Sequence, residues 1–71
     1  MTNRIQLFEV VALTDDLPEH ALWRGQVGTI VEQFGDGAAY EVEFCDRDGR
    51  TYASLGLQPD QFMVLRYEPT A

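Results

Sequence analysis

The amino-acid sequence predicts a small all-β domain in which five short strands curl into a barrel. Apolar residues make up 45% of the 71 positions, and they fall in short runs rich in β-branched and aromatic side chains. Turn residues, chiefly glycine and aspartate, separate these runs. Five strands left as an open sheet would expose an apolar face and two edges, so closure is the arrangement that we expect.

The first two strands are expected on either side of a long polar loop. Residues 5–13 form the first apolar run. Pro18 interrupts the chain after it, and the segment around this proline can form one helical turn through Leu22 before Gly25 ends it. The second strand is expected over residues 26–34, where Gly28 predicts a bulge or a sharp bend.

Two tight turns and a helical turn organise the rest of the chain. Gly35-Asp36-Gly37 predicts a hairpin, because glycine tolerates positive φ. The strict alternation in residues 40–44 predicts a strand that buries every second side chain and turns Glu41 and Glu43 to water. A turn over 46–49 leads to a fourth strand over 50–55. A single 3₁₀ turn in 56–61 then precedes a fifth strand over 62–66.

This succession is typical of a small five-stranded SH3-like barrel with one 3₁₀ turn before the last strand. We expect one domain over residues 5–66, with flexible termini at 1–4 and 67–71. Ten apolar side chains are expected around its centre: Val10, Val27, Ile30, Val31, Tyr40, Val42, Phe44, Leu55, Phe62 and Val64.

The composition excludes several devices that stabilise chains of this size. One cysteine and one histidine provide neither an internal disulfide nor a zinc site built from these ligands. A lone cysteine suits a reducing compartment. The sequence contains no apolar run long enough to span a bilayer, and its N-terminus lacks a signal-peptide pattern. We therefore expect a cytoplasmic protein without a membrane partner.

The charge indicates which partners to expect. The chain has 12 acidic and 5 basic residues, a formal net charge of −7, and its bases are scattered arginines. Such a chain repels nucleic acid at long range and attracts a protein with a basic surface. The alternative is that the charge only keeps a small protein soluble. Pairing of two copies through an edge strand also stays open.

Three segments carry a resemblance to a known family. They are Leu22-x-x-Gly25-x-x-Gly28-Thr29-Ile30-Val31-Glu32, Tyr40-Glu41-Val42-Glu43-Phe44 and Asp48-Gly49-x-Thr51. Over residues 7–65 the chain resembles an uncharacterised bacterial family of small proteins, catalogued only as a domain of unknown function. The resemblance implies the SH3-like fold and no chemistry. Some members of that family are encoded beside toxin-like proteins, which suggests an antitoxin or immunity role.

The Gly-x-x-Gly-Thr-Ile-Val segment is also similar to two other kinds of SH3-like barrel, the ribosomal KOW-type modules and the barrel of nitrile hydratase β subunits. These likenesses leave two alternatives open, a nucleic-acid or ribosome-associated module and an accessory subunit of an enzyme complex. Eukaryotic SH3 domains offer a weaker comparison. The first strand lacks their tyrosines and the chain lacks a tryptophan pair, so we expect no polyproline recognition.

No constellation in the sequence predicts catalysis. Cys45 and His20 are the only candidates for a nucleophile–base pair, and Cys45 lies in an acidic stretch that disfavours a thiolate. We expect it to be a partly buried residue before a turn. Glu41 and Glu43 have a spacing that suits paired carboxylates, but an exposed strand offers no cleft. Gly25-x-x-Gly28 lacks the lysine and the helix of a phosphate-binding loop.

The acidic loop contains the only cluster of metal-ligand residue types, Asp15, Asp16, Glu19 and His20. Its spacing matches no established divalent site. We therefore expect neither a metal nor a cofactor.

Recognition of a protein partner is the function that the sequence favours, because Trp23 and Arg24 are of the residue types enriched at interface hot spots. Trp23 has an alternative role as a cap on the apolar core. The acidic residues of the first loop and of the alternating strand would steer a basic partner. The expected partner-binding residues are Trp23, Arg24, Glu41, Glu43, Asp15 and Asp16.

Overall fold

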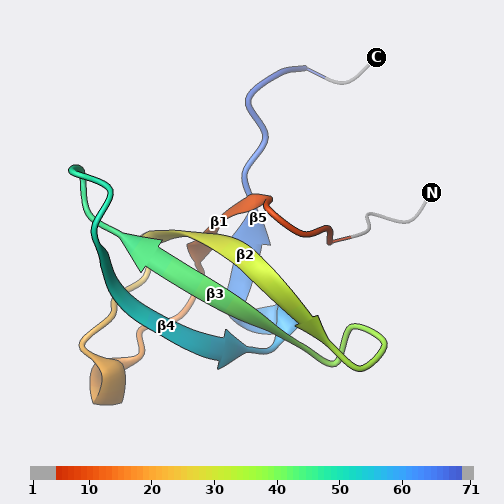
Figure 1. Ribbon diagram of the computed structural model, residues 1–71, viewed down its shortest axis with the longest axis horizontal. Coiled ribbons are helices and arrows are strands. Elements are labelled where there is room, and N and C mark those ends of the chain that lie inside the picture. The colour runs from red at the N-terminus through yellow and green to blue at the C-terminus, as the bar shows by residue number, and fades with distance from the viewer. Residues whose placement is uncertain (1–4, 70–71) are drawn as a thin grey trace.

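The computed structural model describes residues 5–69, and these form one antiparallel sheet of five strands in the order β4-β3-β2-β1-β5 (Figure 1). The predicted all-β class is thereby confirmed. The elements are β1 Val10–Leu13, η1 Pro18–His20, β2 Val27–Phe34, β3 Ala39–Cys45, β4 Thr51–Leu57, η2 Pro59–Gln61 and β5 Phe62–Val64. The expectation of flexible ends at residues 1–4 and 70–71 lies outside the described residues.

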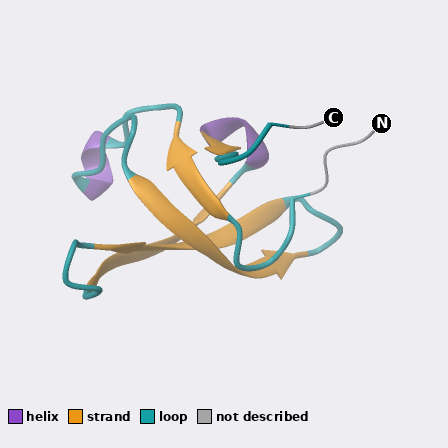
Figure 2. Ribbon diagram, turned by 90° about the horizontal axis from the view of Figure 1, so that it is seen from above, coloured by secondary structure: helices purple, strands orange, loops and turns teal. Residues whose placement is uncertain are grey.

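The sheet is curved (Figure 2). Its strand order leaves it open between β4 and β5. Within residues 5–69 no strand ladder joins these two edges, so the expected closure of the barrel is wrong. One reason is the length of β5, which has only three residues and pairs with β1. The predicted 3₁₀ turn η2 lies directly before β5, as expected.

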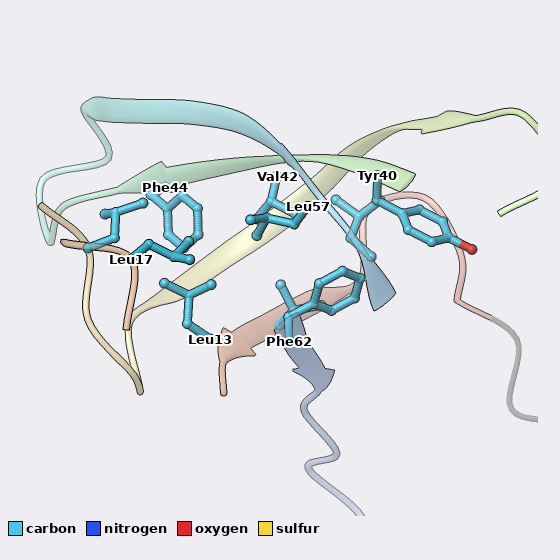
Figure 3. Close-up of a cluster of buried hydrophobic side chains, with 10 residues drawn as sticks. Leu13, Leu17, Tyr40, Val42, Phe44, Leu57 and Phe62 are labelled. Atoms are coloured by element: carbon cyan, nitrogen blue, oxygen red, sulfur yellow. The ribbon is translucent and has the colours of Figure 1, made fainter. Parts of the chain in front are cut away.

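The core lies on the concave side of the curved sheet (Figure 3). The predicted alternation in β3 is confirmed, because Tyr40, Val42 and Phe44 are all buried. Within residues 5–69, the buried apolar residues are Val11, Leu13, Leu17, Leu22, Ile30, Tyr40, Val42, Phe44, Leu57 and Phe62.

The predicted core was wrong at several positions. Val27 is 47% exposed. Val10 and Val31 are only partly buried. Leu55 and Val64 are also partly buried, but they pack against the core as predicted. The physical reason in β1 is that four apolar residues follow one another, so the sequence gives no signal for which alternate pair faces inward. Val11 and Leu13 face the core, and their neighbours face the other side of the sheet.

Strand β1 is shorter than the apolar run that predicted it. The chain turns at Leu7 and Phe8, and Phe8 has a φ of 70°, a backbone conformation that bulky side chains rarely adopt. The Phe8 amide nevertheless donates to the Ile30 carbonyl at 2.7 Å. The N-terminal segment therefore stays attached to β2 without continuing β1.

Gly28 allows two strands to approach each other closely. A Cβ atom at this position would lie 2.7 Å from Cγ1 of Val42 and 3.0 Å from Cδ2 of Phe44. The expected irregularity in β2 lies further along the strand, as a register shift against β3 between Ile30 and Glu32.

The two predicted tight turns are present. In the first, Gly35 and Gly37 have positive φ values of 61° and 93°. In the second, Asp46 Oδ1 accepts hydrogen bonds from the amides of Asp48 and Arg50, at 2.9 and 3.0 Å. The expected helical turn after β1 is the 3₁₀ element η1. It ends at His20 and is followed by Ala21, with φ 55°, before Gly25 is reached.

Candidate functional site

The loop between β1 and β2 is folded onto the core by two leucines. Leu17 and Leu22 are buried, and their backbones exchange hydrogen bonds of 2.8 and 3.2 Å. Leu17 lies at the same end of the core as Phe44 (Figure 3). This small bridge closes the part of the loop that contains η1. The residues that follow Leu22 therefore leave the core from a fixed point.

Trp23 comes directly after this bridge, and its side chain is 52% exposed. The alternative role predicted for it, a cap within the core, does not fit this exposure. The Trp23 amide donates to Oε1 of Gln26, while the Gln26 amide donates to the Trp23 carbonyl at 3.0 Å. Trp23 thus begins a tight turn whose backbone is held at both ends.

Arg24 and Gly25, inside this turn, are attached to the rest of the domain. The Arg24 amide donates to Oδ1 of Asp16 at 2.8 Å, and the Gly25 amide donates to the Leu13 carbonyl at 2.8 Å. Asp16, predicted to steer a partner, therefore has one carboxylate oxygen committed to the loop backbone. Asp15 is exposed.

The turn adjoins a row of apolar side chains on the convex side of the sheet. Ala12 in β1 pairs with Val27 on one side and with Met63 on the other. Directly paired residues share a face, and Ala12 lies between two inward-facing residues, so this row faces away from the core. Val27 and Met63 are about half exposed. We use the name apolar patch for the paired residues Ala12, Val27 and Met63 together with Trp23, which begins the adjoining turn.

A shallow depression connects the turn with this row. Its volume is about 350 Å³, within the range of small-ligand pockets, but it lies open at the surface. The residues that line it are Ala12, Leu13, Thr14, Arg24, Gly25 and Met63. The depression is mainly apolar, and Arg24 is the one charged residue among those that line it.

The remaining predicted residues lie on the neighbouring strands. Glu41 and Glu43 occupy the face of β3 opposite to its buried side chains, and both are partly exposed. Glu41 pairs directly with Glu32, which adds a third carboxylate to this face. Ser54 in β4 donates its hydroxyl to Oε2 of Glu41 at 2.7 Å. We call Glu32, Glu41 and Glu43 the carboxylate row.

The structure therefore divides the predicted site into two groups. Trp23, Arg24 and Asp16 are brought together by the first loop, whereas Glu41 and Glu43 lie on the sheet. Sequence reasoning missed Met63, which joins the patch through strand pairing. It also missed Gln26, whose polar side chain inside a predicted strand was the available signal.

No hydrogen bond within residues 5–69 joins Cys45 and His20, the candidates for catalysis. Cys45 is exposed, contrary to the expected partial burial, and its Sγ lies 3.5 Å from the Thr51 hydroxyl. His20 is exposed on η1. Among residues 5–69, no group of three or more histidine, cysteine, aspartate or glutamate side chains is arranged to hold a metal ion. In the same part of the chain, no helix is long and apolar enough to cross a membrane.

Fold and surface together define a small all-β domain with an open five-stranded sheet, an apolar patch and a carboxylate row. A family-level comparison places the chain more closely. Residues 7–64 match the family described as "Domain of unknown function (DUF4926)", and the chain belongs to this family. The predicted resemblance to a domain of unknown function is confirmed at this level. The searches found no significant match to a curated protein or to a solved structure.

Proposed function

We propose that this domain is a non-catalytic protein-binding module whose partner presents a basic surface. The observation that carries the proposal is Trp23, a half-exposed indole on a turn whose backbone is held by hydrogen bonds. Neutralisation of a toxin-like protein, or regulation of another basic protein, is the concrete form that we favour. The relation to bacterial SH3-like barrels is part of the same proposal.

Binding gains free energy from the side chains that it buries and loses free energy from the groups that it orders. Tryptophan contributes disproportionately to interfaces because it buries a large area with few rotatable bonds. Ordering a loop on binding costs free energy. The Trp23 turn is already tied to Gln26, to Asp16 and to the Leu13 carbonyl, so less of this cost remains to be met on association.

Charge supports a basic partner. The net charge is −7, and the carboxylate row lies on the same convex side of the sheet as Val27 and Met63. Thr29 lies between the apolar row and the carboxylate row, because it pairs with Val10 on one side and with Glu43 on the other. An acidic field beside an apolar patch accelerates encounters with a basic surface and orients them.

The distribution of the arginines bears on the nucleic-acid alternative. Arg24 lies in the first loop and Arg66 follows β5, while Arg47 and Arg50 share the β3–β4 turn with two aspartates. Among residues 5–69, these four arginines come from three separate segments, which does not favour a contiguous basic surface for phosphates. The other alternative, an accessory subunit of an enzyme complex, would show itself if a larger catalytic chain co-purified with the domain.

The experiment is parallel capture of partners from an extract of the native source, using the wild type and Trp23→Ala as baits. A partner that binds the wild type and is lost from Trp23→Ala supports the proposal. Tyr67→Ala is the matched control, because Tyr67 is also an exposed aromatic residue but lies outside the patch. Glu43→Arg and its control Asp36→Arg test the charge in the same way. Equal capture by Trp23→Ala and the wild type would contradict the proposed surface.

A further inference from the structure

Strand β4 is an unprotected edge of the sheet. It has seven residues and pairs only with β3, at the end of the strand order. It contains no charged residue and no proline, the usual devices that prevent an edge from pairing with another chain. The opposite edge, β5, is protected by its length of three residues. The two edges are therefore not equivalent, and β4 is the one suited to accept a further strand (Figure 1).

The backbone of β4 has hydrogen-bonding capacity on its outer side. Apart from the ladder with β3, no backbone–backbone hydrogen bond within residues 5–69 involves Thr51–Leu57. In an antiparallel edge strand, alternate amides and carbonyls point away from the sheet. An extended peptide that lies beside β4 would use these groups and gain main-chain affinity.

The convex face beside this edge offers a recognition element, the carboxylate of Glu41. Its Oε1 lies 3.9 Å from the position that a Cβ atom on Gly56 would take. Its Oε2 accepts the Ser54 hydroxyl at 2.7 Å. The carboxylate of β3 thus lies close to β4 at Gly56, and Cε2 of Phe34 lies 4.0 Å from the same position. An added strand lies about 4.8 Å beyond β4, so an arginine or lysine opposite Gly56 would reach Glu41.

The concave face of the same edge is apolar. Ala53 and Leu55 are partly buried and pack against the core. An added strand would place side chains opposite Ala53 and Leu55. These side chains would cover the area of the two residues that is still exposed. Because successive side chains point to opposite faces, the segment that fits β4 alternates between basic and apolar residues.

We propose that β4 accepts an extended segment of the partner protein by strand addition, with its basic side chains facing Gly56 and Glu41 and its apolar side chains facing Leu55. This inference rests on the proposed function and names the form of the partner. A second copy of the chain fits less well. It would bring another net charge of −7, and its own β4 contains no base to place opposite Glu41.

The test is a nuclear magnetic resonance titration of the full chain with a capped heptapeptide, Val-Arg-Val-Arg-Val-Arg-Val, matched to the seven residues of β4. We expect the largest amide shifts, and new protection from hydrogen exchange, in Thr51–Leu57. Two control peptides separate the contributions. A peptide with glutamate in place of each arginine should not bind, because its charges repel the carboxylate row. A peptide with alternate backbone amides methylated should not bind either, because it cannot donate the main-chain hydrogen bonds to β4.

A pair of protein variants tests the role of the carboxylate. Glu41→Gln should weaken binding of the arginine peptide by about fivefold, as expected for one partly exposed ion pair. Asp36→Asn, which removes an exposed carboxylate in the β2–β3 turn, should leave the affinity unchanged. The same wild-type affinity in Glu41→Gln would overturn the assignment of Glu41.

Other outcomes would refute strand addition at β4. Shifts confined to the Trp23–Gln26 turn would refute strand addition and leave the proposed function standing. Unchanged binding of the methylated peptide, or no binding of the arginine peptide at all, would also refute it. A second copy would be the occupant, in place of the partner's segment, if two results came together. Sedimentation would have to show a dimer of the free chain, and hydrogen exchange would have to show protected β4 amides in that dimer.

Discussion

The side-chain amide of Gln26 donates a hydrogen bond to the hydroxyl of Tyr52, with 2.9 Å between Nε2 and the phenolic oxygen. The other end of the same amide accepts the backbone N–H of Trp23. One side chain therefore connects the turn of the apolar patch with the beginning of β4. The two surfaces that we assign to partner binding meet at this residue, although they come from distant parts of the sequence.

Gln26→Ala should loosen the Trp23 turn without unfolding the domain. The substitution removes the acceptor of the Trp23 amide and the donor to Tyr52, both exposed hydrogen bonds of modest net value, about 1 kcal/mol each at most. We expect faster hydrogen exchange at the Trp23 amide. Tyr52→Phe is the control, because it removes the phenolic partner alone and should leave that amide protected. Equal exchange in all three proteins would contradict the role of Gln26.

Gly28→Ala should destabilise the domain by about 1–3 kcal/mol, the range for overpacking a well-packed core. The added methyl group would overlap Val42, at 2.7 Å, and the Glu43 carbonyl, at 3.0 Å. The midpoint of urea unfolding measures the effect. Gly56→Ala is the matched control, since its nearest neighbour lies at 3.9 Å, and it should change stability little. A Gly28 variant as stable as the Gly56 variant would refute the close approach.

Phe8→Gly should raise the stability by up to about 1 kcal/mol. Phe8 has a φ of 70°, which costs a residue with a Cβ about 1–2 kcal/mol. Its side chain is 72% exposed, so little buried area is lost, and the greater freedom of glycine in the unfolded chain offsets part of the gain. Leu7→Gly lacks the conformational benefit and should destabilise. The same unfolding free energy for both variants would argue against strain at Phe8.

Leu22→Ala should cost about 2–5 kcal/mol, as buried leucines generally do. Leu22 is 1% exposed although it lies in a loop. Thermal unfolding followed by far-ultraviolet circular dichroism measures the loss. Leu7→Ala, at a half-exposed leucine, should cost far less. If the two losses were equal, the first loop would not be part of the core.

The sequence predicted those elements whose residues allow only one arrangement. In β3, acidic residues separate the aromatic and aliphatic ones, so Tyr40, Val42 and Phe44 could be assigned to the core directly. Glycines in the β2–β3 turn need positive φ, which located that turn. The 3₁₀ turn before β5 was predicted within residues 56–61, and Pro59 stands at its first position.

The wrong predictions concern residues whose burial is decided by tertiary contacts and not by the local sequence pattern. Residues 10–13 are apolar throughout, so only packing selects Val11 and Leu13 for the core. The leucines of the first loop stand in a polar stretch, and their mutual bridge is not visible as a pattern. For the candidate site, Trp23 was found from its residue type. Met63 joined it only because β5 pairs with β1.

Fluorescence of Trp23, the only tryptophan in the chain, tests the proposed function most directly. The captured partner would be titrated into the wild-type domain while the emission maximum and acrylamide quenching are recorded. Burial of the half-exposed indole in the interface predicts a shift to shorter wavelength and weaker quenching on binding. A partner that binds while both signals remain unchanged would contradict the assignment of Trp23 to the interface.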